Sequence, residues 1–485
     1  MNNTSGNDTD RALRGLRQIG SAQLVTQLVT WGLTAVTMHL LQPRDYGLIA
    51  TAGLFTMFTW MLLDGGLAPV LVSQRELSLQ LQGAAVTAVL MVSLLLAVTI
   101  FAVAPIGSSF FRSPPLRAIL DVSAFYLPLT ALGVVPRAQL SKCMQFNRLA
   151  RVRVTAGISQ GLSTLALAFM GEAYWALIIG AFVGTTLEVS LLWWSLDSRP
   201  TPNFLLRELT PLIRNGSHMI AQRLTYFVVG NFDTFLLSRI WGPAVLGPYS
   251  VARTLAHTVH EKISGVTGQI SVPAFAARSE AEDQIRGLIG VVSITATIVF
   301  PLFWLLGIMS QVAIPWIFGV KWTPMVVPFL AFTAILPLRT IYTFLNSSLI
   351  GTGRTGLTLK NTLSWAVILV PLVLIGSIKG AVGVAIGWAA AVPVAFYVAM
   401  RRTSKVFGID KMRLLRPLIV PAVCGAASAL SAEAIFLGLA SRLAPVFTIA
   451  CECVVGAVCF PVSLKWLSQS QYEQTVSFVR RVVRV

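Results

Sequence analysis

The sequence of 485 residues is poor in charge: only 12% of its residues are Asp, Glu, Lys or Arg, whereas 55% are hydrophobic. A soluble chain carries about 25% charged residues. So few charges cannot cover the surface of a water-soluble protein of this length. Soluble enzymes, disordered chains and fibrous proteins are therefore excluded, and a polytopic membrane protein is the class that remains.

Acidic residues are the scarcest charges: 19 Asp and Glu stand against 37 Lys and Arg, a net charge of +18. Because the basic residues lie mainly between apolar segments, we expect them to set the membrane topology and to meet anionic lipid, not nucleic acid. Cysteine is also scarce. The five cysteines are an odd set that lies mostly inside apolar runs, which disfavours a disulfide framework.

Long runs without charge are what the sequence has instead. Residues 77–111 and 287–320 contain no Asp, Glu, Lys or Arg, and a spanning helix needs about 20 mostly apolar residues. Because these runs are continuous rather than alternating, they predict helices, not a β-barrel. Cuts at Pro, Gly and charge clusters give 14 predicted spans, at 18–41, 46–73, 82–104, 117–140, 152–171, 173–195, 212–240, 246–275, 287–309, 324–350, 358–378, 381–400, 414–438 and 444–466.

An even number of spans places both termini on one side of the membrane. That side carries about 25 Lys and Arg and the other about 7, so the positive-inside rule predicts cytoplasmic termini. The first apolar run lacks a cleavage site and is interpreted as a retained span. The predicted division is a cytoplasmic tail, an N-lobe of six spans, a C-lobe of six spans, a C-terminal span pair and a cytoplasmic basic tail, at 1–17, 18–200, 201–405, 406–466 and 467–485.

An internal repeat with an offset of 200 residues supports two lobes. Pro43 and Gly47 align with Pro243 and Gly247 without a gap. Each copy predicts a span, a tight turn and a returning span. Because the offset equals six spans, we expect two parallel six-helix bundles related by a pseudo-twofold axis along the membrane normal, the build of many secondary transporters. Chance Pro/Gly turns are the alternative.

Ionisable residues inside the predicted spans are the candidate functional residues, because a charge in hydrocarbon costs about 2.5–3.5 kcal/mol on insertion scales. Basic groups at mid-depth suit an anionic substrate, since Arg binds phosphate or carboxylate with two parallel hydrogen bonds. The substrate-binding candidates are Arg223, Arg253, His257 and Arg339. The candidates for ion coupling or gating are Asp64, Asp233, Glu261 and Lys262. The alternative for each is an interhelical ion pair that only fixes packing.

Several motifs resemble a known family. Residues 231–251, NFDTFLLSRIWGPAVLGPYSV, are similar to the mid-chain signature of bacterial polysaccharide repeat-unit flippases, which belong to the multidrug/oligosaccharidyl-lipid/polysaccharide exporter superfamily. LLDGGLAPVLVSQREL at 62–77, QFNRLARVRV followed by GEAYWALIIG, FGVKWTP, and GTGRTGLTLK also agree with that family. The family often has Gly where this chain has Ser238. The resemblance covers about residues 15–405 and transfers no functional residue.

The resemblance implies a transporter of the multidrug-exporter fold, not an enzyme. It implies translocation of an undecaprenyl-pyrophosphate-linked oligosaccharide from the cytoplasmic to the periplasmic leaflet by alternating access, with H⁺ or Na⁺ as the suspected coupling ion. We expect no cofactor and no metal, a monomer, and membrane lipids, a polysaccharide polymerase and export machinery as candidate partners. The alternatives are a multidrug/cation antiporter of the same superfamily, a membrane glycosyltransferase or polymerase, and a scaffold without transport activity. The short loops leave no room for a soluble catalytic domain.

Overall fold

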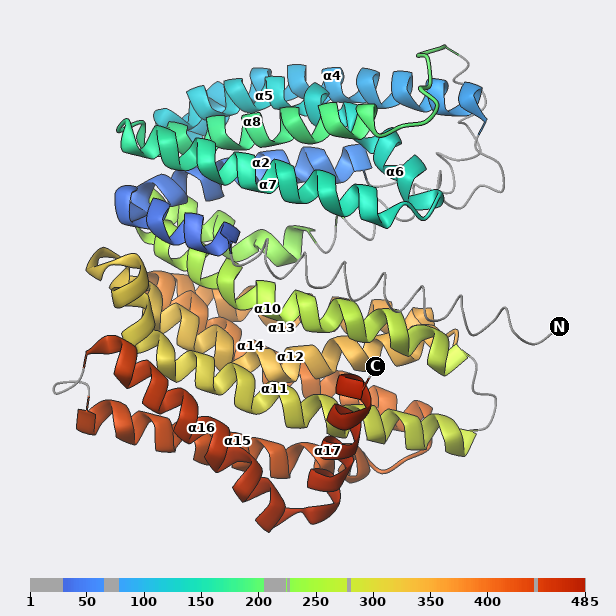
Figure 1. The fold of residues 1–485 in the computed structure, drawn as a ribbon, viewed down its shortest axis with the longest axis vertical. Coiled ribbons are helices and arrows are strands. Elements are labelled where there is room, and N and C mark those ends of the chain that lie inside the picture. Colours follow the sequence, from blue (N-terminus) through green and yellow to red (C-terminus); the bar gives the residue numbers. More distant parts are fainter. Residues whose placement is uncertain are drawn as a thin grey trace. The chain divides into compact units, whose positions relative to one another are not determined.

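The structure is a computed structural model that describes residues 29–64, 78–204, 224, 227–276, 281–439 and 444–484 (Figure 1). Within these ranges every regular element is a helix and no strand occurs. Residues 29–40 and 227–240 are helical. The further α-helices are α2 Pro43–Asp64, α4 Leu79–Phe110, α5 Pro115–Leu132, α6 Val134–Lys142, α7 Phe146–Phe169, α8 Ala173–Trp194, α10 Pro243–Ala276, α11 Ala281–Phe318, α12 Val326–Gly351, α13 Thr355–Gly376, α14 Gly380–Val406, α15 Lys411–Leu439, α16 Pro445–Leu467 and α17 Gln469–Arg484.

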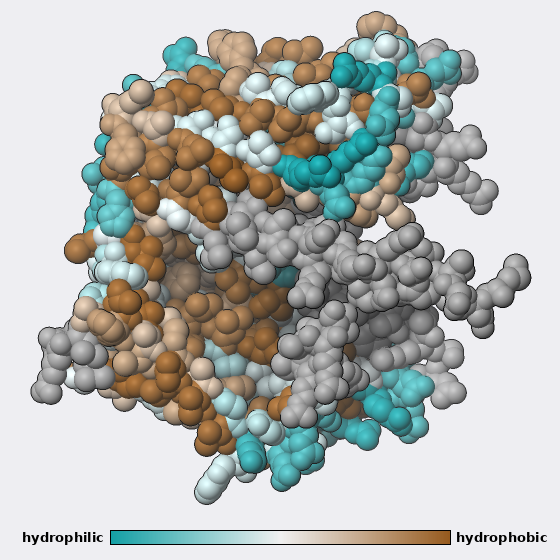
Figure 2. All heavy atoms as spheres, viewed as in Figure 1, coloured by the Kyte–Doolittle hydropathy of each residue, from teal (hydrophilic) through white to brown (hydrophobic). Residues whose placement is uncertain are grey.

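Nine helical segments of the described part are long and apolar enough to cross a membrane. Large apolar side chains lie exposed along them, such as Leu95 and Val98 on α4 and Val367 on α13. Figure 2 shows hydrophobic residues over most of the described surface along the helices. Such faces are stable only against lipid. The predicted all-α polytopic membrane protein is confirmed.

The chain divides into two compact units, Met1–Gly247 and Pro248–Val485. In the first, α2, α4 and α5 bury a shared apolar core that includes Leu48, Ile100 and Leu120. In the second, α11, α12, α14 and α15 do the same around Val292 and Phe344. The lobe boundaries inferred from the predicted spans stay a prediction.

The two aligned turns of the sequence repeat lie against each other within the first unit. A Cβ placed on Gly47 would collide with the backbone carbonyl of Pro243, and one placed on Gly247 would collide with that of Pro43. This reciprocal contact requires glycine at both positions because two backbones approach closely. One helical turn away, the buried hydroxyls of Thr51 and Ser238 lie 2.7 Å apart. Ser238 therefore has a polar partner at the position where the family often has Gly.

The span predicted at 117–140 is divided at Gly133 into α5 and α6. Glycine is a weak helix former, so a break at this position has a low cost. The indole Nε1 of Trp193 donates a hydrogen bond to the carbonyl of Leu132 at 2.9 Å. The division thus exposes a backbone acceptor that a neighbouring helix satisfies.

Candidate functional site

The second unit brings three of the predicted basic residues together. Arg253 and His257 lie one turn apart on α10, and Arg339 lies on α12. The Nη1 of Arg339 donates a hydrogen bond to His257, 3.0 Å from Nε2. All three side chains are partly buried. The face of α10 that carries His257 therefore meets α12 through a direct polar contact.

Two tryptophan side chains pack against these three residues. Trp388 on α14 is 1% exposed, and its ring lies 5.2 Å from the guanidinium carbon of Arg339 and 6.0 Å from that of Arg253. The ring centre of Trp365 on α13 lies 5.6 Å from the guanidinium carbon of Arg339 and 5.9 Å from the ring centre of Trp388. The ring of His257 also meets Trp388 edge to face. We call these five residues the Arg–Trp cluster.

A layer of packed side chains supports the Arg–Trp cluster. Phe332, which is fully buried on α12, contacts the rings of His257, Trp388 and Tyr249. One turn beyond His257, the Nδ1 of His260 lies 2.9 Å from the hydroxyl of Thr340. These contacts hold α10, α12 and α14 in one register. The cluster is therefore held by packed helices rather than by a loop.

The chemistry of the Arg–Trp cluster suits an anion. The face of a guanidinium that stacks on an indole is attracted to the ring. The N–H donors of the guanidinium point outward in its own plane and are not used by this contact. Those donors match the spacing of phosphate or carboxylate oxygens. Partial burial strengthens such contacts, because the charges are less screened than at a surface.

The other predicted site residues are not in this cluster. Arg223 and the side chain of Asp64 lie outside the described residues. Asp233 belongs to the first unit, where it is 2% exposed and accepts a hydrogen bond from the backbone N–H of Thr234 at 2.7 Å. Glu261 and Lys262 are exposed on α10. Their coupling roles stay predictions.

Sequence analysis missed both tryptophans of the cluster. A usable signal existed: Trp388 is the one indole in a helix made mostly of Gly, Ala and Val, so it fills space where its neighbours cannot. It also missed Glu188 on α8, whose carboxylate lies 2.8 Å from Nη2 of Arg137. Arg137 lies within the span predicted at 117–140, but nothing in the sequence pattern identifies its partner.

Comparison with solved structures identifies the fold. The fold is similar to a structure described as lipid II flippase MurJ in an inward closed conformation, with a TM-score of 0.75, 12% identity, and coverage of 93% of this chain and 99% of that one. A multidrug resistance MATE family transporter in an inward-facing conformation has a TM-score of 0.57 at 17% identity, over 78% of this chain and 95% of that one. The chain thus has the fold of this exporter superfamily.

Sequence comparison defines the family. A family described as polysaccharide biosynthesis protein matches residues 36–327, more than half of the chain, and the protein belongs to that family. It is 22% identical to the lipopolysaccharide biosynthesis protein WzxC of Escherichia coli over 76% of both chains. It is 25% identical to the teichuronic acid biosynthesis protein TuaB of Bacillus subtilis, over 62% of this chain and 63% of that one.

A third relative is the succinoglycan biosynthesis transport protein ExoT of Rhizobium meliloti, 24% identical over 60% of both chains. The resemblance to repeat-unit flippases is confirmed, and so is the expectation of a multi-pass membrane transporter rather than an enzyme.

Proposed function

We propose that the protein translocates an undecaprenyl-pyrophosphate-linked oligosaccharide from the cytoplasmic to the periplasmic leaflet of the inner membrane. The observation that carries this proposal is the Arg–Trp cluster, in which two arginines lie near the face of Trp388, a residue of a segment long and apolar enough to cross a membrane. Relatives that bear the names of polysaccharide biosynthesis and transport proteins support the class of cargo.

In this proposal the Arg–Trp cluster binds the head group during its passage. A sugar head with a pyrophosphate is too polar to enter hydrocarbon unaided. Arg253 and Arg339 offer hydrogen-bond donors to phosphate or acidic sugar oxygens, and Trp365 and Trp388 offer flat rigid surfaces. Alternating access of the two lobes then exposes the head on the other side, driven by H⁺ or Na⁺ that binds at a buried acid such as Asp233.

A multidrug/cation antiporter is the competing function within the superfamily. A site for cationic drugs needs acidic and aromatic side chains, since a like charge repels the cargo. The Arg–Trp cluster supplies aromatic rings together with cations, which favours an anionic cargo. Orientation of the termini toward the cytoplasm, a monomeric state, and cooperation with a polymerase and export machinery belong to the same proposal.

The test is the double variant Arg253→Ala/Arg339→Ala in cells that depend on this gene for a surface polysaccharide. The matched control is Arg151→Ala/Arg153→Ala, which removes two exposed arginines from α7. Loss of two charged hydrogen-bonding groups should lower the rate of export about 100-fold. The control should export normally at the same membrane level. Full export by the cluster variant at normal membrane levels would refute the proposal.

A conservative variant tests whether stacking matters as well as charge. Arg339→Lys keeps the positive charge but replaces the planar fork with a point charge that stacks poorly on Trp365 and Trp388. We expect export between that of the wild type and that of the double alanine variant. Wild-type export in this variant, combined with loss in the alanine variant, would assign the role to charge alone.

A further inference from the structure

The C-terminal helix α17 has the sequence pattern of a helix that lies on a membrane surface. Tyr472, Val476, Val479 and Val483 recur at spacings of four, three and four residues, which places them on one helical face. Polar and basic residues make up most of the rest of the helix. The sequence predicted this segment only as a basic tail. An amphipathic helix directly after the last span belongs at the lipid headgroup level.

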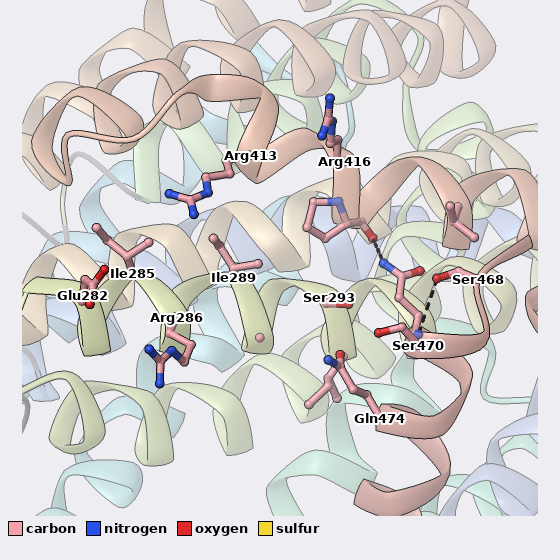
Figure 3. Close-up of a pocket in the computed structure, with 15 residues that line it drawn as sticks. Glu282, Ile285, Arg286, Ile289, Ser293, Arg413, Arg416, Ser468, Ser470 and Gln474 are labelled. Carbon is pink, nitrogen blue, oxygen red and sulfur yellow. Dashed lines mark hydrogen bonds between the residues drawn. The ribbon is translucent and has the colours of Figure 1, made fainter.

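A pocket of about 660 Å³ lies beside α17, between the N-terminal parts of α11 and α15 (Figure 3). Arg413 and Arg416 of α15 line one side and Arg286 of α11 lies across from them. Glu282 is the one acidic residue among the described residues of the lining, so three arginines and one glutamate give this part of the lining a formal charge of +2. The pocket is large enough for a lipid headgroup.

The guanidinium groups of this basic pocket are available to a ligand. In the part of the chain that the structure describes, no hydrogen bond or ion pair engages the guanidinium groups of Arg286, Arg413 or Arg416. Gln471 of α17 donates to the carbonyl of Pro417 at 3.3 Å. Its Oε1 is buried and has no hydrogen-bond partner among the described residues. Three cationic side chains thus line this space, and those of Arg416 and Arg286 extend to opposite sides of it in Figure 3.

An apolar track leads away from the basic pocket along α15. Ile419 and Val423 follow Arg416 at three and seven residues, on the same helical face, and they are 53% and 51% exposed. A phosphate held by Arg416 would therefore have its acyl chains beside exposed aliphatic side chains. This continuity favours a bilayer lipid over a free anion as the occupant.

We propose that the basic pocket binds the phosphate of an anionic phospholipid headgroup and so fixes α17 at the membrane surface. The site differs from the Arg–Trp cluster in its residues and in the helices that form it, and it does not depend on which cargo is carried. Arg413 and Arg416 of α15 bind the phosphate, and α17 covers the headgroup from the aqueous side.

The experiment measures binding of phosphatidylglycerol to the purified full-length protein by native mass spectrometry, with phosphatidylcholine as the neutral lipid. The pocket variant is Arg413→Gln/Arg416→Gln. The matched control is Arg401→Gln/Lys405→Gln, which removes two exposed charges from the end of α14. Each basic residue near a lipid surface contributes about 1 kcal/mol, so the pocket variant should bind phosphatidylglycerol about 30-fold more weakly. The control should change binding less than about threefold.

Two further measurements distinguish binding of a lipid headgroup from binding of free phosphate. Millimolar inorganic phosphate should leave phosphatidylglycerol bound, and phosphatidylcholine should bind equally weakly to all three proteins. Equal weakening in pocket and control variants would show general attraction to a basic surface and overturn the proposal. Displacement of the lipid by inorganic phosphate, or equal binding of phosphatidylcholine, would also overturn it. Export activity of the pocket variant is a separate measurement and does not enter this test.

Discussion

Two arginines within predicted spans, Arg137 and Arg339, meet opposite environments. In the first unit, Arg137 on α6 lies 2.8 Å from the carboxylate of Glu188 on α8, and the two side chains are 28% and 24% exposed. In the second unit, Arg339 contacts the ring of His257 and the faces of two tryptophans. The carboxylate of Glu188 neutralises the charge of Arg137. The rings around Arg339 hold its guanidinium in place and carry no negative charge.

The difference distinguishes a packing role for Arg137 from the binding role that we propose for Arg339. A neutralised pair contributes to the association of its two helices and offers little to a substrate, because its donors are occupied. A guanidinium on a ring face is positioned and stays cationic. Charge within a span is therefore a weak indicator of function by itself, and the neighbours of that charge decide which role it has.

Among the variants that test this comparison, the largest loss of stability should come from a substitution of Trp388. Trp388→Ala removes a fully buried indole that contacts both arginines, and such a truncation costs about 3–5 kcal/mol of unfolding free energy. Thermal unfolding in detergent measures the loss. Trp194, which is 75% exposed, provides the control Trp194→Ala, for which we expect a change below about 0.5 kcal/mol. Equal stability of the two variants would show that Trp388 is not the support of the cluster.

Glu188→Ala should have the next largest effect, because it leaves Arg137 beside α8 without its carboxylate. Removal of one partner from a half-buried pair costs about 1–3 kcal/mol, less than for a fully buried pair because water still screens the charge. The double variant Arg137→Glu/Glu188→Arg should recover most of the lost thermal stability. If the exchanged pair is no more stable than Glu188→Ala, the ion pair is not what joins α6 to α8.

Sequence alone predicts the helices and their order well. The span predicted at 324–350 corresponds to α12, Val326–Gly351, and the glycines of the predicted turns, Gly47 and Gly247, lie where the backbone approaches another backbone closely. Apolar length and glycine at a tight turn are local properties, and the physical reason for each is contained in a short stretch of chain.

Partners across helices are not predictable in the same way. Which residue meets Arg137 depends on the rotation of α8 about its own axis, and 51 residues separate Arg137 from Glu188. The same holds for Arg339 and Trp388, which only the packing of α12 against α14 brings together. Periodicity names the face of a helix, and only the neighbouring helix decides what that face contacts.

A third arginine, Arg148, forms an ion pair outside the predicted spans. A variant of this pair should change thermal stability the least of the three, and it extends the comparison to an exposed arginine. Its Nη1 lies 3.0 Å from Oδ1 of Asp197, and this hydrogen bond, with a second from Gln145, lowers the pKa of Asp197. A carboxyl whose pKa is lowered by folding stabilises the folded state above its ordinary pKa of about 4. That contribution is lost as the pH falls through the lowered value.

Asp197→Asn should therefore lower the midpoint of thermal unfolding slightly at pH 7 and low salt, and the difference from the wild type should shrink toward zero in acid. The effect is small because both side chains are exposed and salt screens them. Arg148 keeps its 2.8 Å hydrogen bond to the carbonyl of Ser195 in this variant, so the comparison isolates the carboxylate. A difference that does not change with pH would mean that the charge of Asp197 contributes nothing, and that Arg148 is held by the backbone alone.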